Sequence, residues 1–290
     1  MEGLSNIGTI KEILNSYGFK FSKSMGQNFL INPSVCPRMA EMCGAGKGVG
    51  VLEVGPGIGV LTNELCKLAD KVVSVELDKR LIPVLGETLA EYNNFKLING
   101  DIMEIDLQKL IQEEFANLDV VVCANLPYYI TSPVIMKFLE EKLPIKSLTV
   151  MVQKEAADRL TAPVGSRESG AVTVSVAYYS KPEFLFNVSR GSFMPSPNVD
   201  SAVIRLNIDE KPNVLVKKEN DLKRIIRAGF SQRRKTLSNC LSSSLGMDKA
   251  TVNSLIERAG LTSAVRAEKL SLEDFGRLAD CLTEYESNEK

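Results

Sequence analysis

The feature that most constrains this chain is a glycine turn, Gly55-Pro-Gly-Ile-Gly59, between the apolar run Gly50–Val54 and the amphipathic segment Leu61–Leu68. Three glycines in five residues let a backbone turn tightly and approach a ligand that any Cβ would push away. Strand, glycine turn and helix in this order are typical of a nucleoside-cofactor site in a parallel sheet. The GxGxG spacing departs from the dinucleotide fingerprint GxGxxG, and a plain tight turn between strand and helix remains the alternative.

Short apolar runs alternate with helix-like periods through residue 150. The candidate strands are Gly50–Val54, Val72–Glu76, Phe95–Ile98, Asp119–Ala124 and Ser147–Val152. Alternating strands and helices imply a mostly parallel, doubly wound α/β sheet that is covered on both faces. Two later runs, Glu183–Val188 and Ser201–Ile208, predict an antiparallel addition at the sheet edge. The segment Val172–Tyr179 fits either a strand or a helix packed on the sheet.

The 290 residues, 44% of them hydrophobic, are enough for one large domain and one small domain. A polar break at Asp209–Asn213 is followed by one short strand-like run, Val214–Val216, and then by helical periods, so we expect a main domain over 1–210 and a small all-helical domain over 211–290. The polar residues 1–30 predict an N-terminal extension, a helix and a loop lying over the cofactor site. Ser132 and Pro133 predict the N-cap and first turn of a helix.

The composition excludes several kinds of chemistry. The chain has no histidine, which removes Ser-His-Asp and Cys-His triads, imidazole bases and HExxH zinc sites. The six cysteines form no CxxC pair, so they predict core residues in a reducing cytoplasm and no metal site, with structural zinc as a remote alternative. No apolar stretch approaches the roughly 20 residues that span a bilayer, and the N-terminus lacks the apolar region of a signal peptide. The chemistry is therefore expected to use carboxylates, amides, backbone groups and aromatic rings.

Two acidic residues follow successive predicted strands. Glu76 ends the second strand, 21 residues after Gly55, where a carboxylate can accept hydrogen bonds from ribose hydroxyls. Asp101 follows the third strand, where it can meet an adenine amino group. Open α/β sheets bind ligands at the carboxyl ends of their strands, so these acids and the glycine turn together predict a cofactor site.

The turn Asn125-Leu-Pro-Tyr128 follows the fourth predicted strand and predicts the acceptor site. The Asn125 side-chain oxygen and the Leu126 carbonyl can accept the N–H bonds of an exocyclic amine. Such acceptors favour the tetrahedral nitrogen of a methyl-transfer transition state. Pro127 biases Leu126 toward extended geometry, and Tyr128 can stack on the base. A turn chosen only for its Asn and Pro is the alternative.

Two further features are weaker. Phe193, in a proline-rich loop, can sandwich a flipped base opposite Tyr128, although plain loop packing explains it equally well. Residues 217–240 hold eight basic and two acidic side chains in a chain of net charge −1. Basic residues on one helix face would bind RNA phosphates, with a solvated helix face as the alternative. The candidates are Arg224, Arg227, Arg233, Arg234 and Lys235.

With these motifs in place, the chain resembles the KsgA/RsmA ribosomal RNA adenine dimethyltransferases over almost its full length. The matching stretches are Lys23-Ser-Met-Gly-Gln-Asn-Phe-Leu30, Val51-Leu-Glu-Val-Gly-Pro-Gly-Ile-Gly-Val-Leu-Thr62, Val75-Glu-Leu-Asp78, Asn125-Leu-Pro-Tyr128, Gln153-Lys-Glu155, Pro195-Ser-Pro-Asn-Val-Asp-Ser-Ala-Val203 and Phe230-Ser-Gln-Arg-Arg-Lys-Thr-Leu237. Met25 and Tyr129 depart from the residues common in the family, and neither touches an assigned role.

The resemblance implies a class I (Rossmann-like) methyltransferase that uses S-adenosylmethionine. It implies two methyl groups on N6 of each of two adjacent adenosines, in the loop of the 3′-terminal helix of 16S rRNA, during 30S assembly. The implied cofactor residues are Asn28, Leu30, Gly55, Gly57, Glu76, Asp101 and Asn125. The implied catalytic and base-stacking residues are Asn125, Leu126, Pro127, Tyr128 and Phe193. We expect a monomer that has no membrane partner.

Four other classes of protein share some of these features. The nearest is the macrolide-resistance type of 23S rRNA adenine dimethyltransferase, disfavoured by the Arg/Lys-bearing C-terminal domain. A DNA adenine methylase would more often carry Asp-Pro-Pro-Tyr in the acceptor turn. A non-catalytic ribosome-assembly factor is disfavoured by the intact Glu76, Asp101 and Asn125. An NAD-dependent dehydrogenase is disfavoured by the glycine spacing and the missing histidine.

Overall fold

The computed structural model describes residue 4, residues 6–18 and residues 28–288. The expected loop over the cofactor site, with the motif residues 23–27, lies outside this part of the chain. The contacts divide the chain into two units. The first comprises 1–157 and 183–208, and the second comprises 158–182 and 209–290. The second unit therefore takes in 158–182, which the sequence had assigned to the main domain.

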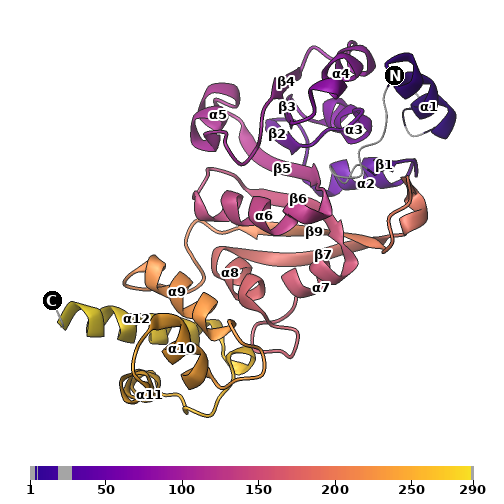
Figure 1. Ribbon diagram of the computed structural model, residues 1–290. Coiled ribbons are helices and arrows are strands. Elements are labelled where there is room, and N and C mark those ends of the chain that lie inside the picture. The colour runs from indigo at the N-terminus through magenta and orange to yellow at the C-terminus, as the bar shows by residue number, and fades with distance from the viewer. Residues whose placement is uncertain (1–3, 5, 19–27, 289–290) are drawn as a thin grey trace. The chain divides into compact units, whose positions relative to one another are not determined.

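A seven-stranded sheet forms the centre of the first unit, in the order β4-β3-β2-β5-β6-β9-β7 (Figure 1). Its strands are β2 (Val49–Val54), β3 (Lys71–Glu76), β4 (Phe95–Asn99), β5 (Asp119–Asn125), β6 (Ser147–Gln153), β7 (Ser180–Val188) and β9 (Ser201–Ile208). The pairs from β4 to β6 are parallel, and β9 is antiparallel to β6. This arrangement confirms the predicted strands, the parallel sheet and its antiparallel edge.

Both faces of the sheet are buried. Successive strand residues point to opposite sides, so two buried neighbours in a strand show that both faces are covered. Val51 and Leu52 are neighbours in β2 and both are fully buried. Val51 belongs to the hydrophobic core that the first four helices share with one face of the sheet. The helices of the first unit are α1 (Ile7–Ser16), α2 (Val35–Met42), α3 (Val60–Leu68), α4 (Ile82–Thr88), α5 (Leu107–Glu114), α6 (Thr131–Glu140) and the start of α7 (Lys154–Leu160).

The helix after the acceptor turn begins earlier than predicted, because its N-cap is Ile130 and not Ser132. The short 3-10 turn η3 (Tyr128–Ile130) leads directly into α6, and Ile130 is the N-cap. Ser132 and Pro133 therefore lie inside the first turn, where the missing N–H of proline costs no helical hydrogen bond.

A second, two-stranded sheet joins segments that are far apart in the sequence. β1 (Phe29–Leu30) pairs antiparallel with β8 (Phe193–Met194), so that Leu30 is opposite Phe193. The Ile31 N–H donates to the Ser192 carbonyl at 2.8 Å and extends this pairing. These contacts bring the N-terminal segment and the proline-rich loop to the same place in the fold.

The second unit is helical. It contains α8 (Ala171–Tyr179), α9 (Glu219–Gly229), α10 (Leu237–Leu245), α11 (Lys249–Arg258), the 3-10 turn η5 (Ala267–Lys269) and α12 (Leu272–Asn288). The ambiguous segment Val172–Tyr179 is therefore a helix. Asp221 of α9 is buried and accepts a hydrogen bond from Thr283 of α12 at 2.7 Å. This contact fastens the two helices that form the centre of the unit.

Candidate active site

One pocket of the first unit collects all the residues that the sequence predicted for cofactor binding and catalysis. They come from the carboxyl ends of β2, β3, β4 and β5 and from the β1–β8 pair. The pocket is lined by Asn28, Leu30, Gly55, Gly57, Glu76, Asp101, Asn125, Leu126, Pro127, Tyr128 and Phe193, among others. Strand ends converge here because parallel strands carry their carboxyl ends at one edge of the sheet.

The glycine turn has the backbone geometry that only glycine adopts freely. Gly55, Gly57 and Gly59 have φ angles of 70°, 61° and 91°. A Cβ on Gly57 would also lie 3.2 Å from the ring of Phe29. The turn therefore needs glycine for its conformation, and at Gly57 also for close approach.

Glu76 holds this turn from the neighbouring strand. Its carboxylate accepts hydrogen bonds from the Gly57 N–H at 3.3 Å and the Asp78 N–H at 2.8 Å. Burial raises the pKa of Glu76, and these backbone donors act in the opposite direction. A carboxylate in this position is fixed at the pocket wall before any ligand binds.

Asp101 lies beyond the end of β4. One of its carboxylate oxygens accepts a hydrogen bond from the Met103 N–H at 2.8 Å, which orders the turn that follows the strand. The same side chain lines the pocket. Its position at the next strand end from Glu76 is the one that the sequence predicted.

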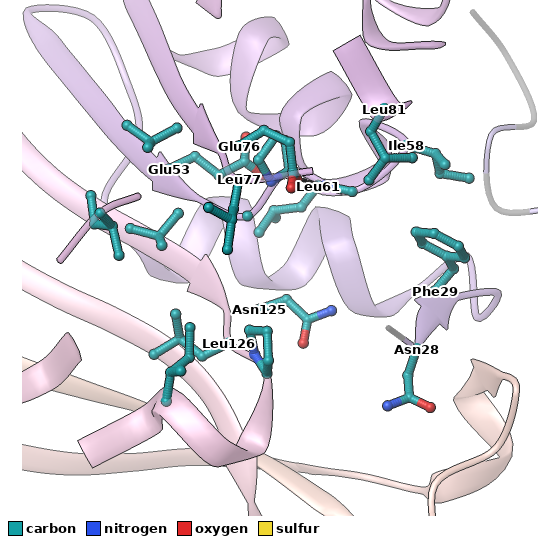
Figure 2. Close-up of a pocket in the computed structure, with 18 of the residues that line it drawn as sticks. Asn28, Phe29, Glu53, Ile58, Leu61, Glu76, Leu77, Leu81, Asn125 and Leu126 are labelled. Atoms are coloured by element: carbon teal, nitrogen blue, oxygen red, sulfur yellow. Dashed lines mark hydrogen bonds between the residues drawn. The ribbon is translucent and has the colours of Figure 1, made fainter. Parts of the chain in front are cut away.

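The acceptor turn begins where β5 ends. Asn125 is opposite Met151 in the β5–β6 pair, and the Leu126 N–H donates to the Met151 carbonyl at 3.4 Å. Within the described chain, neither the Asn125 amide nor the Leu126 carbonyl takes part in a hydrogen bond of the fold. Figure 2 shows Asn125 across the pocket from Glu76. The fold thus leaves two oxygen acceptors available at this corner.

Two aromatic rings line the same pocket. The Tyr128 hydroxyl is 2.8 Å from the Ser201 hydroxyl of β9, and the half-buried position raises the pKa of Tyr128. Phe193 is 4% exposed and is held by the pairing of β8 with β1. The rings reach the pocket from segments 65 residues apart, as the sandwich hypothesis requires.

Sequence reasoning assigned no role to Glu53, which also lines the pocket. Its side chain is 1% exposed, and one carboxylate oxygen accepts hydrogen bonds from Thr62 at 2.7 Å and Ser74 at 2.6 Å. The other oxygen has no hydrogen-bond partner among the described residues. Burial raises the pKa of Glu53 to about 7. The sequence signal that could have revealed Glu53 is a carboxylate inside an otherwise apolar strand.

The predicted RNA-binding residues divide into two groups. Arg224 forms ion pairs with Asp221 at 2.9 Å and Glu286 at 2.7 Å, so its charge is committed to the fold of the second unit. Arg227, Arg233, Arg234 and Lys235 are exposed. The prediction that Arg224 binds RNA is therefore corrected, because its guanidinium group is paired with acids of the second unit.

The predicted basic helix face is also wrong. α9 ends at Gly229, so the Arg233–Lys235 segment lies in the turn before α10. Phe230, at the end of α9, stacks on Phe275 with ring centroids 5.8 Å apart. Its ring therefore packs inside the second unit.

The described residues show neither a membrane-crossing helix nor a metal-ligating cluster. No helix among them is both long and apolar enough to span a bilayer. They contain no group of three or more cysteine, aspartate or glutamate side chains placed to hold a metal ion.

A parallel sheet with a glycine turn after one strand, an acid after the next and an Asn-Leu-Pro-Tyr corner at the same edge defines a class I methyltransferase. Residues 18–284 match the family model described as ribosomal RNA adenine dimethylase. The chain therefore belongs to the ribosomal RNA adenine dimethylase family and is an rRNA methyltransferase.

Curated relatives and solved structures support the same family assignment. The chain is 45% identical to the ribosomal RNA small subunit methyltransferase A of Alkaliphilus oremlandii, covering 97% of this chain and 99% of the relative. Its identity to the protein of the same name from Bacillus mycoides is 44%, with 97% and 98% covered. A dimethyladenosine transferase from Plasmodium falciparum superposes with a TM-score of 0.72 at 27% identity, covering 90% and 98% of the two chains. For the 23S rRNA methyltransferase ErmE the TM-score is 0.65 at 27% identity, with 88% and 100% covered.

The methyl donor of this enzyme is S-adenosylmethionine, and the pocket residues fit it. The glycine turn lines the pocket, and a Cβ at Gly57 would crowd the ring of Phe29, which also lines it. Glu76 presents a fixed carboxylate, and the unpartnered oxygen of Glu53 adds a buried acceptor. These polar groups match a ligand that carries ribose hydroxyls and cationic groups.

The Gly57→Ala substitution is expected to weaken S-adenosylmethionine binding. An alanine at φ 61° is strained by about 1–2 kcal/mol, and relief of that strain displaces the turn. We expect a loss of about tenfold in affinity, measured by isothermal titration calorimetry. Gly86→Ala is the matched control, because no atom lies within 4 Å of its added Cβ. Equal affinities for the two variants would contradict the assignment of the turn.

The Glu53→Gln substitution is expected to change how stability depends on pH. The pKa of Glu53 is about 7 in the folded chain against an ordinary value of 4.5, so the folded state holds its proton more tightly. The cost of the buried charge is absent below pH 4.5 and grows until about pH 7. As pH rises, the unfolding free energy of the variant should therefore increase relative to that of the original protein, by up to roughly 3 kcal/mol. Denaturant titrations between pH 5 and pH 8 measure this difference, and a constant difference would count against the buried charge.

Proposed function

We propose that this protein transfers methyl groups from S-adenosylmethionine to N6 of two adjacent adenosines of 16S rRNA, in the loop of the 3′-terminal helix. The observation that carries the proposal is the pair of free oxygen acceptors at Asn125 and Leu126, in the same pocket as Glu76. The 44–45% identity to small-subunit methyltransferases over 97% of the chain supports the small subunit as the source of the substrate.

The proposed cofactor residues lie around the glycine turn. Glu76 would accept hydrogen bonds from the ribose hydroxyls, and Asp101 would accept from the adenine amino group of the cofactor. Asn28 and Leu30, which precede and form β1, would close the pocket from the other side. When bound, S-adenosylmethionine supplies an electrophilic methyl group.

The acceptor turn would prepare the amine of the target base. The lone pair of an adenine amino group is delocalised into the ring, which makes this nitrogen a poor nucleophile. The Asn125 amide oxygen and the Leu126 carbonyl would hold its N–H bonds out of the ring plane and stabilise the positive charge that develops. A residue before proline is biased toward extended geometry, so Pro127 favours an extended Leu126, and it donates no hydrogen bond that would compete for these acceptors. The product amine is acidic enough to lose its proton to water, so the absence of histidine is no obstacle.

Tyr128 and Phe193 would hold the base that has left its stack. Both residues line the pocket, and stacking on an aromatic ring contributes about 1–3 kcal/mol per base. The contact with Ser201 fixes the Tyr128 hydroxyl, so the ring does not have to be ordered when the base arrives. This arrangement favours a flipped or single-stranded adenosine over a paired one.

The substrate would be a 30S assembly intermediate in the cytoplasm, bound by a monomer. The exposed Arg227, Arg233, Arg234 and Lys235 would contact phosphates of the RNA backbone. The free cysteines of the described chain are consistent with a reducing compartment.

A second candidate is methylation of 23S rRNA, because the chain also superposes on ErmE over that protein's whole length. The identity to ErmE is 27%, against 45% to a small-subunit enzyme. Transfer of radiolabelled methyl groups to under-methylated 30S subunits, mature 30S subunits and 50S subunits separates the two. We expect label in under-methylated 30S only, at the N6 positions of adenosine. Label in 50S alone would support the second candidate and refute the first.

The Asn125→Ala substitution is expected to lower turnover by about 10²-fold, because one acceptor of the transition state is lost. Affinity for S-adenosylmethionine should change far less. Single-turnover methyl transfer and cofactor titration measure the two effects. The control is Asn239→Ala, an exposed asparagine in α10. A loss of turnover matched by an equal loss of cofactor affinity would remove the catalytic role of Asn125.

A further inference from the structure

Tyr129 is a pocket residue to which neither cofactor binding nor methyl transfer assigns a role. It directly follows the Asn-Leu-Pro-Tyr turn, within η3, and it lines the same pocket as Asn125 and Tyr128. Its side chain is 58% exposed, which makes it the most exposed aromatic ring among the described residues. A tyrosine ring has a large apolar face, so at the edge of a ligand pocket it offers a surface that a ligand can cover.

Three other aromatic side chains of the described chain line the pocket, and the fold holds each of them. Phe29 and Phe193 are 6% and 4% exposed and belong to the paired strands β1 and β8. Tyr128 is bound through its hydroxyl to Ser201. Within the described part of the chain, the side chain of Tyr129 takes part in neither a hydrogen bond nor a ring contact. Its ring is therefore available to a ligand.

The backbone that carries this ring is fixed on both sides. The Ile130 N–H donates to the Pro127 carbonyl at 3.1 Å, which closes the 3-10 turn, and α6 begins at Thr131. Tyrosine has only two side-chain torsions, so its ring loses little conformational entropy when a ligand covers it. The turn thus presents the ring of Tyr129 from a rigid support.

Tyr128 and Tyr129 are directed at different parts of a ligand. A 3-10 helix has about three residues per turn, so the side chains of successive residues point about 120° apart. Tyr128 is half-buried and reaches Ser201, whereas Tyr129 is mostly in solvent. With Tyr128 against the base inside the pocket, the ring of Tyr129 is left at the rim, beside the next nucleotide of the strand.

Extrusion of a base into a pocket has a cost that an aromatic ring at the rim can reduce. The target base leaves its stack, and its neighbour in the strand thereby loses a stacking partner. Every base has a π face, so an aromatic side chain can replace that partner whatever the neighbouring base is. A ring that covers the neighbour lowers the free-energy cost of holding the target base in the pocket.

We propose that Tyr129 stacks on the base next to the target adenosine. The inference rests on the proposed function and deepens it, because that function places two target adenosines side by side. The strand enters the pocket in one direction, so Tyr129 meets the neighbour on the same side in both transfers. In one transfer this neighbour is the other adenosine, and in the other transfer it is a base outside the pair. The contact makes Tyr129 a substrate-binding residue.

The test compares Tyr129→Ala with Tyr129→Phe and with Phe184→Ala in the full-length protein. Phe184 is 38% exposed on β7 and lies outside the pocket lining that the described residues form. In Tyr129→Ala, the KM for under-methylated 30S subunits should rise about fivefold or more. Its kcat should stay within about twofold, because the stack is the same in the ground state and in the transition state. Tyr129→Phe keeps the ring, so it and Phe184→Ala should both match the original protein.

A second measurement varies the neighbouring base. In two altered forms of under-methylated 30S, one or the other of the two adenosines is replaced by uridine, which leaves a single target with a changed neighbour. Uridine has the smaller ring and stacks more weakly, so the original protein should show a higher KM for one of the two forms. Tyr129→Ala should show the same KM for that form as for unaltered 30S, because it has no ring to stack on either neighbour.

Three outcomes would overturn the proposal. An unchanged KM in Tyr129→Ala is the first, and an equal rise in Tyr129→Phe is the second, since the hydroxyl would then be responsible and not the ring. The third is a loss confined to kcat, which would place Tyr129 at the reacting amine. The exposed position predicts an unchanged Tm for Tyr129→Ala. Methylation of 30S by the unmodified protein is scored separately, so failure of the stacking contact is distinguishable from failure of the proposed function.

Discussion

The cofactor pocket depends on one buried carboxylate. Glu53 lies two residues before the glycine turn, and one of its oxygens is shared between Thr62 of α3 and Ser74 of β3. These two hydrogen bonds tie the strand before the turn to the helix after it and to the neighbouring strand. The three glycines of the turn have positive φ angles, and Ile58 between them is fully buried, so the shape of the turn is imposed by its surroundings. Glu76 adds a second tie from the next strand end, through the N–H of Gly57.

The other wall of the pocket depends on a contact between distant segments. β1 and β8 are two residues long each, and neither would form alone. Their pairing places Phe29 against Gly57 and brings Phe193 to the pocket. The glycine turn is therefore packed by an aromatic residue from the N-terminal segment, while the acceptor turn is braced by Ser201 of β9. The pocket is assembled from both ends of the first unit, which makes its geometry a property of the whole fold.

The sequence was sufficient to predict the sheet and to predict which residues lie together around the pocket, and the physical reason is the same for both. Each central strand is a mostly apolar run that is followed by polar residues, and a parallel sheet brings those ends together. Features that depend on pairing across the chain were not predictable in this way. The two-residue strands have no periodicity, and the burial of Glu53 depends on which face of β2 it occupies. The predicted domain boundary at residue 210 left 158–182 in the main domain. The reason is that the helix at Val172–Tyr179 has a mostly apolar sequence, which fits a strand of the sheet equally well.

The basic stretch shows why charge along a sequence differs from charge in space. Three of its cations are bound by acids of the second unit: Lys217 pairs with Glu284, Lys223 with Glu219, and Arg224 with Asp221 and Glu286. Two of these partners, Glu284 and Glu286, are more than 60 residues away, so no local pattern reveals the pairing. The cations of the turn before α10 are left without such partners, and Arg167 and Arg266 join them from outside the stretch. The fold thus pairs three cations of the stretch with acids, leaves Arg227 exposed on α9, and places the cations of the turn before α10 at a cavity within the second unit.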